Sequence, residues 1–121
     1  MEQKLRIAPV RAGAYFATKV LDCYYEKINT CKGEKEILRF ILKVPYKNAY
    51  HNVDIVTFCN DYEYSEYQIL INKIVHYFEL EEFDPECLIC RYVNVDLTTR
   101  TDNKGNEYMK IINIFPYKSN Q

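Results

Sequence analysis

The chain has 121 residues, of which 48% are hydrophobic and 15% aromatic, and its formal net charge is -1. This length and composition are typical of one globular domain spanning residues 1–121, and they exclude a disordered chain. Residues 1–11 lack an apolar signal segment and no stretch approaches the length of a membrane span, so we expect a cytoplasmic protein without a membrane partner.

Charge is distributed unevenly along the chain. Residues 1–48 carry ten Lys/Arg and five Asp/Glu, residues 49–90 carry one Lys and nine acids, and residues 91–121 carry five Lys/Arg and three acids. The local balances are therefore +5, -8 and +2. Because phosphate contacts need local positive charge, a net charge near zero is compatible with a nucleic-acid binder.

The first half of the chain is expected to be rich in β-strands. Residues 13–25 are aromatic and β-branched, and their imperfect alternation around Ala17–Lys19 indicates a bulge. A polar loop is expected at residues 26–35. Apolar residues alternate along residues 36–44 and 49–59, which predicts a second and a third strand.

A helix is expected at Ser65–Leu80. The motif Ser65-Glu-Tyr-Gln68 has the form of a capping box, in which the Ser65 hydroxyl accepts from the Gln68 amide while the Gln68 side chain reaches back. After it, apolar residues recur at helical spacing, at Tyr67, Leu70, Ile71, Ile74, Val75 and Phe78.

The last third of the chain predicts a β-hairpin. Strands are expected at residues 88–101 and 107–115, joined by a turn at residues 102–106 in which Gly105 can take a positive φ. Two short terminal segments complete the domain: an arm at residues 1–9 and a polar tail at residues 117–121.

The order of these elements indicates the fold. Five strands with one helix between the third and the fourth have the connectivity of the OB-fold, a small Greek-key barrel. We therefore expect a mainly β, OB-fold-like barrel with a single helix. Its binding surface would lie on the strands at 36–44 and 49–59, between the loops at 26–35 and 101–106.

A single-strand binder needs cations along the phosphates and flat side chains under the bases. Arg39 and Lys43 lie on the face of their strand opposite its core face, and alternation puts one of Tyr24 and Tyr25 outward. The candidate binding residues are the cations Arg39, Lys43, Arg100 and Lys104 and the aromatics Tyr25, Tyr46, Tyr50 and Phe58.

Three segments resemble a known family. Gly13-x-Tyr15-x-Ala17 at the start of a strand is similar to the opening of small phage-type single-stranded DNA-binding proteins of the OB-fold. Residues 83–95 resemble their entry into the fourth strand, with Cys90-Arg91 where that family usually has Gly-Lys, and residues 99–111 resemble their last hairpin. The resemblance covers most of the chain. It implies a protein of a phage or mobile element that binds single-stranded DNA or RNA.

Enzymatic activity and bound cofactors are not expected. The chain has two His and three Gly, and no catalytic spacing or Gly-rich phosphate loop stands out. The five Cys are expected to be free thiols, because Cys87-x-x-Cys90 lacks the second half of a zinc site. The alternative to a nucleic-acid binder is a protein-interaction module, an inhibitor or adaptor that docks a basic protein through the acidic helix or through an exposed Tyr-rich face.

Overall fold

The computed structural model describes residues 5–118, so parts of the predicted arm and tail lie outside it. It contains five strands and one α-helix, with a short 3-10 turn (η1, Pro85–Cys87) before the fourth strand. In chain order they are β1 (Gly13–Thr30), β2 (Gly33–Tyr46), β3 (Ala49–Phe58), α1 (Glu66–Tyr77), β4 (Tyr92–Thr101) and β5 (Glu107–Pro116). The prediction of a mainly β protein with one helix between its third and fourth strands is confirmed.

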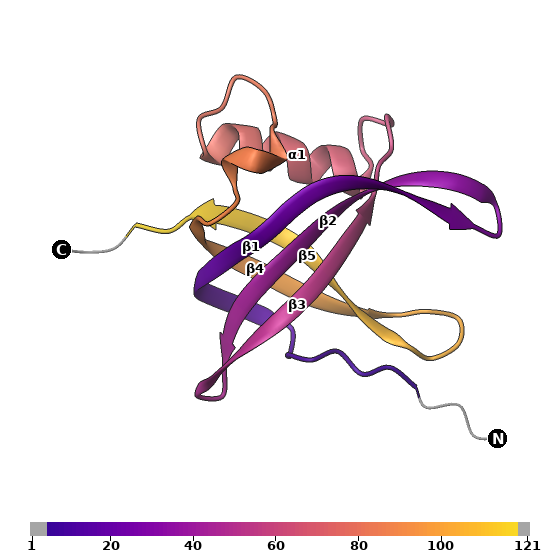
Figure 1. The fold of residues 1–121 in the computed structure, drawn as a ribbon, viewed down its shortest axis with the longest axis horizontal. Helices are drawn as coiled ribbons and strands as arrows, with labels where there is room; N and C mark the ends of the chain where they lie inside the picture. Colours follow the sequence, from indigo (N-terminus) through magenta and orange to yellow (C-terminus); the bar gives the residue numbers. More distant parts are fainter. Residues whose placement is uncertain (1–4, 119–121) are drawn as a thin grey trace.

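The five strands form one antiparallel sheet in the order β3-β2-β1-β4-β5 (Figure 1). Within residues 5–118 no backbone ladder joins the two edge strands β3 and β5, so the sheet is open in its hydrogen bonding. The edge strands are nevertheless in contact, and Lys110 Nζ on β5 donates to the Val56 carbonyl oxygen on β3 at 3.3 Å.

Strand β1 changes its partner along its length. Its first part pairs with β4 and its second part with β2, and Lys19 belongs to both ladders. The predicted bulge lies just before this point, where Ala17 takes a φ of 53° and its amide donates to Asn94 Oδ1 at 3.1 Å. A bulge bends and twists a strand, which lets β1 leave one neighbour for the other.

The core lies on the inner face of the curled sheet. On β2 this face consists of Leu38, Phe40, Leu42 and Val44, all fully buried. Helix α1 lies across one end of the sheet (Figure 1) and contributes Leu70 and Ile74 to the same core. The helix thereby covers apolar side chains that an open sheet end would expose to water.

The loop predicted at residues 26–35 is wrong. Strands β1 and β2 run to Thr30 and from Gly33, and a two-residue turn joins them. Thr30 Oγ1 donates to the Gly33 carbonyl at 2.8 Å and accepts from the Lys32 amide at 3.2 Å, while Gly33 takes a φ of 102°. Polar residues tolerate this two-stranded extension because both of its faces meet water.

The β2–β3 connection is a second tight hairpin. Lys47 and Asn48 have φ angles of 50° and 61°, the type I′ arrangement that matches strand twist. Strand β2 continues through Pro45 to Tyr46 and does not stop at Pro45 as predicted. The missing amide of Pro45 is tolerated because the β1–β2 ladder starts only at the Lys19–Lys43 pair.

Only one of the two hydrogen bonds expected of the capping box forms within residues 5–118. Ser65 Oγ accepts from the Gln68 amide at 3.1 Å, but Gln68 Nε2 donates to the Asn60 carbonyl at 3.2 Å and does not reach back to Ser65. The helix ends at Tyr77, three residues before the predicted Leu80. Glu79 takes a φ of 54°, a left-handed conformation that ends an α-helix.

The fourth strand starts later than predicted, at Tyr92 instead of residue 88. Asp84 caps the turn η1, since its Oδ1 accepts from the Glu86 amide at 3.0 Å. Cys90 then takes a φ of 69°, which interrupts any extended run. A turn capped by Asp-Pro is more stable here than four additional strand residues.

Candidate nucleic-acid interface

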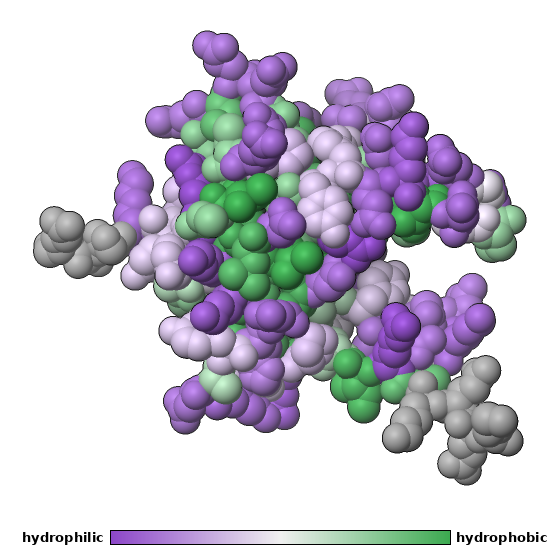
Figure 2. Space-filling view, in the orientation of Figure 1, coloured by the Kyte–Doolittle hydropathy of each residue, from purple (hydrophilic) through white to green (hydrophobic). Residues whose placement is uncertain are grey.

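The outer face of the sheet carries a row of aligned polar and aromatic side chains. Strand register places Asn52 opposite Lys43, Lys43 opposite Lys19, and Lys19 opposite Tyr92. We call this set of four residues from β3, β2, β1 and β4 the lysine row. Figure 2 views the side of the molecule on which β1, β2 and β3 lie in front, and hydrophobic atoms (green) gather over its middle among hydrophilic ones.

The two lysines of the lysine row are directly opposed in strand register and have no acidic partners among residues 5–118. Within residues 5–118, neither Lys19 nor Lys43 has a carboxylate oxygen within 4.0 Å of its Nζ. Like charges directly opposite on neighbouring strands destabilise a sheet. This arrangement is therefore unfavourable for folding and favourable for binding anions at the two lysines.

Aromatic rings accompany both lysines. Lys43 Nζ lies 4.8 Å from the ring centroid of Tyr50, and Lys19 Nζ lies 5.9 Å from that of Tyr92. Tyr50 is 67% exposed and Tyr92 is 53% exposed, so each ring keeps open surface. Cations next to exposed rings are the combination that binds the phosphates and bases of a single strand.

Acidic residues lie in the adjacent row. Asp54 pairs with Ile41, and Ile41 pairs with Asp22. Ile41 lies two residues from Lys43, and Asp22 lies three residues from Lys19 because the register shifts between Val20 and Asp22. Asp54 forms an ion pair with Arg39, and Asp22 Oδ1 accepts a hydrogen bond from the Cys23 amide at 2.9 Å. The positive charge is therefore confined to the lysine row and its end of the sheet.

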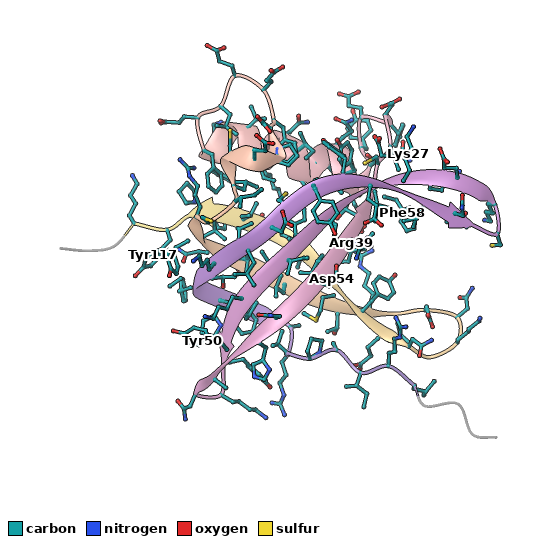
Figure 3. The ribbon with its side chains drawn as sticks, in the orientation of Figure 1. Lys27, Arg39, Tyr50, Asp54, Phe58 and Tyr117 are labelled. Atoms are coloured by element: carbon teal, nitrogen blue, oxygen red, sulfur yellow. The ribbon has the colours of Figure 1, made fainter. Side chains whose placement is uncertain are left out.

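Arg39 lies on the predicted outer face, but its charge is neutralised there. Its Nε donates to Glu26 Oε2 at 2.9 Å, and its Nη1 donates to both carboxylate oxygens of Asp54 at 2.8 Å. Figure 3 shows Arg39 and Asp54 close together over the middle of the sheet. Hydrogen bonding to Asp54 raises the pKa of the guanidinium. Arg39 therefore offers a phosphate little net charge, in contrast to the prediction from sequence.

Tyr25 lies away from this surface. Its hydroxyl shares a 2.6 Å hydrogen bond with that of Tyr67 on α1, and its ring packs edge-on against Tyr67 and Phe83. The outward member of the pair is Tyr24, opposite Arg39 on β2. Alternation along β1 shows that one of the two tyrosines faces outward, but a second irregularity of the strand, between Val20 and Asp22, decides which one.

Tyr46 and Tyr50 lie at the β2–β3 hairpin, as predicted. Tyr46 packs edge-on against Tyr15 and His51, with ring centroids 6.2 and 5.7 Å apart. Its ring also has Lys47 Nζ at 5.3 Å. Tyr46 is thus a half-buried support, whereas Tyr50 presents its ring to solvent beside Lys43.

Phe58 lies at the other end of β3 from Tyr50 (Figure 3). It is half exposed and lines a groove of about 930 Å³ between β3, the start of β5 and the segment Arg6–Pro9. The groove is also lined by the acids Asp54, Asp102 and Glu107 and by the cations Arg6 and Lys110. Phe58 is therefore placed to stack, but acids outnumber cations around it, unlike in the lysine row.

Arg100 and Lys104 lie at different places on the β4–β5 hairpin. Arg100 Nη1 forms an ion pair with Glu66 Oε1 at 2.5 Å, so it faces the start of α1 and not the outer face of β2. Lys104 lies at the exposed hairpin tip, where its amide donates to Asp102 Oδ1 at 2.8 Å. These two cations do not converge with Lys43 on one surface.

Three of the four residues of the lysine row, Asn52, Lys19 and Tyr92, were missed from the sequence. Lys19 and Tyr92 become neighbours of Lys43 only through the two ladders of β1. A signal existed for Lys19, since it is a lone charge inside an otherwise uncharged stretch from Ala12 to Leu21. Nothing in the sequence indicated that it would face another lysine.

Among residues 5–118 there is no group of three or more His, Cys, Asp or Glu side chains suited to a metal ion. The same residues contain no helix with the length and apolar character needed to cross a membrane. A scan against protein-family models and searches of curated proteins and of solved structures found no match to this chain.

Proposed function

We propose that this protein binds single-stranded nucleic acid with little sequence preference and without catalysis. The observation that carries the proposal is the Lys19–Lys43 pair, two directly opposed lysines that lack acidic partners among residues 5–118. Phosphates bound at the two ammonium groups would reduce their repulsion and release counterions. Binding of nucleic acid would thus offset a charge repulsion that is unfavourable for folding.

The neighbouring tyrosines could bind the bases of the nucleic acid, as the lysines could bind its phosphates. Base stacking on an aromatic ring contributes about 1–3 kcal/mol and tolerates any base, since every base has a flat face. Tyr50 and Tyr92 lie at opposite ends of the lysine row. Four adjacent strands span about 14 Å at their usual spacing. A short strand running across the sheet would meet a ring, two cations and another ring in turn.

The finer architecture that goes with this function is an OB-type barrel. Edge strands β3 and β5 are in contact, and Lys110 joins them through the Val56 carbonyl. Its ammonium also lies 3.7 Å from Glu66 Oε2 at the start of α1. We propose that these contacts hold the open sheet in a barrel shape, with the lysine row on its outside. A phage-type origin fits the resemblance in the sequence and remains part of the proposal.

The direct test is binding of a fluorescently labelled oligo-dT strand to the wild-type protein, followed by anisotropy at low salt. We expect saturable binding that weakens as salt rises, and similar affinity for oligo-dA and oligo-U of equal length. Absence of saturable binding to all three strands at low salt would show the proposal to be wrong.

One observation favours the alternative, a protein-interaction module. Tyr62 and Tyr64, in the loop before α1, are 63% and 68% exposed and pack edge-on with their centroids 5.7 Å apart. They alternate with Asp61 and Glu63, a composition suited to a basic protein surface. If nucleic acid does not bind, this loop is the surface to test for a protein partner.

A further inference from the structure

A hollow of about 610 Å³ lies at the end of the lysine row, lined by Ala17, Phe78, Arg91, Tyr92, Pro116 and Tyr117. We call it the Tyr92 pocket. We propose that it receives one nucleobase of a bound single strand, so that the strand is held in a fixed position on an otherwise sequence-tolerant surface. The inference rests on the proposed function and specifies a second part of the same interface.

The lining suits a flat aromatic ligand. Three of the six lining side chains, Phe78, Tyr92 and Tyr117, are aromatic, and a proline and an alanine complete the apolar wall. The volume falls within the range of about 300–1,000 Å³ that is usual for small-molecule sites. Stacking against such rings gains affinity from any base without reading its edge.

Among the described residues that line the pocket, the one charged side chain is positive. Arg91 has its guanidinium carbon 5.4 Å from the ring centroid of Phe78. In residues 5–118 it has no carboxylate oxygen within 4.0 Å, unlike Arg39 and Arg100. Stacked guanidinium groups retain donors for a phosphate or a base edge. An apolar hollow with one unpaired cation therefore favours a nucleotide over a neutral apolar ligand.

The pocket is continuous with the lysine row through Tyr92, which belongs to both. Lys19 Nζ lies 5.9 Å from the ring centroid of Tyr92. A phosphate held at Lys19 would thus bring the base of the same or the next nucleotide to the pocket. Tyr50 and Tyr117, at the two outer limits of this surface, lie toward the same end of the molecule, opposite Lys27 and Phe58 (Figure 3).

The backbone around the pocket is irregular on both sides. Ala17 and Cys90 take φ angles of 53° and 69°, although neither residue is glycine. Backbone strain of this kind clusters at binding sites. The bulge at Ala17 bends β1 next to Tyr92, and the interruption at Cys90 delays the start of β4, so that Arg91 projects beside the hollow.

The test uses 2-aminopurine, a fluorescent base that is quenched when it stacks on tyrosine. A series of oligo-dT strands just long enough to bind, each with 2-aminopurine at one position, is titrated with the wild-type protein. We expect one position to be quenched far more than the others. Tyr117→Leu and Arg91→Ala should abolish that position's extra quenching and weaken binding roughly 5- to 50-fold.

Matched controls separate the two levels of the proposal. Tyr62→Leu removes an exposed tyrosine that lies in the loop before α1 and does not line the Tyr92 pocket, so it should change neither quenching nor affinity. If strands bind but quenching is equal at every position, or survives in Tyr117→Leu, the pocket inference is wrong while the binding function stands. If the wild-type protein binds none of the strands, both are wrong. Thermal melting of each variant checks that the fold is retained.

Discussion

Two cations on one strand illustrate how the surroundings decide the role of a residue. Arg39 and Lys43 lie on the same face of β2, and their sequence context is alike. Arg39 meets Glu26 from β1 and Asp54 from β3, whereas Lys43 meets Lys19 and Asn52. The two carboxylates hold the Arg39 side chain against the sheet and neutralise its charge. Lys43 has no such partner among the described residues, so its ammonium group is available to an anion.

Arg39→Ala should therefore reduce stability more than it reduces binding. It leaves two carboxylates without their partner on the sheet surface, where the Arg39 side chain is only 20% exposed. After allowance for solvent screening, we expect a loss of about 1–2 kcal/mol in the free energy of unfolding. Urea denaturation measures it. Lys27→Ala, which breaks an exposed pair with Glu34 at 4.0 Å, should cost under about 0.5 kcal/mol. An Arg39→Ala variant with wild-type stability and a reduced salt dependence of binding would make Arg39 a direct phosphate contact instead.

The cysteines should differ in their reactivity toward a thiol reagent. Burial raises the pKa of Cys23 to about 12 and that of Cys59 to about 11. Cys31, Cys87 and Cys90 are exposed. Since the thiolate is the reactive form, we expect three thiols to react quickly at about pH 8, Cys59 slowly, and Cys23 only after unfolding. Titration with a chromogenic disulfide, with and without denaturant, counts them. Fast labelling of Cys23 in the native protein would contradict the core packing.

At the scale of elements, the Ser65 side chain caps the first turn of helix α1. Ser65 Oγ accepts from the Gln68 amide and donates to the Asn60 carbonyl at 3.3 Å. Ser65→Ala removes both bonds and should lower the free energy of unfolding by about 1 kcal/mol, as measured by urea denaturation. Ser65→Asp keeps an acceptor at the cap and should retain most of it. Equal stability of Ser65→Ala and the wild type would show that packing of Leu70 and Ile74 alone holds the helix.

The elements that could be predicted are those that depend on local chemistry. The cap at Ser65, the alternation along β2 and the bulge near Ala17 each depend on residues close in sequence, and all three are present. The long β1–β2 hairpin extension was missed because polar residues in an exposed strand resemble a loop. The start of β4 was misplaced because the capped turn at Asp84 competes with strand residues.

The candidate site could be predicted only in part, since it depends on register between distant strands. Sequence alternation placed Lys43 on the face opposite the core, and Tyr50 was expected beside the turn between the second and third strands, where it lies. It could not show that the bulge aligns Lys19 with Lys43, or that Glu26 and Asp54 both reach Arg39. A shift of one residue in register moves every side chain to the opposite face, so small errors in strand pairing change the whole surface.

At the scale of the whole molecule, segregation of charge along the sequence does not become a broad basic face. Of the predicted cations, Arg39 and Arg100 are bound to acids, and Lys104 lies at a distant hairpin tip. What remains is a narrow site at one end of the sheet, made by Lys19, Lys43 and the rings beside them. We therefore expect few phosphate contacts and a shallow salt dependence of nucleic-acid binding.

The most direct test compares the salt dependence of oligo-dT binding for the wild type and for Lys19→Ala/Lys43→Ala. If each lysine holds one phosphate, the slope of log K against log salt should fall by about 0.7 per lost contact between about 50 and 200 mM salt. The stability of the double variant should stay within about 1 kcal/mol of the wild type, because a like-charge pair is removed. Lys27→Ala/Lys32→Ala removes the same charge at the far hairpin and should keep the wild-type slope. An unchanged slope in Lys19→Ala/Lys43→Ala, or an equal fall in both double variants, would contradict the account.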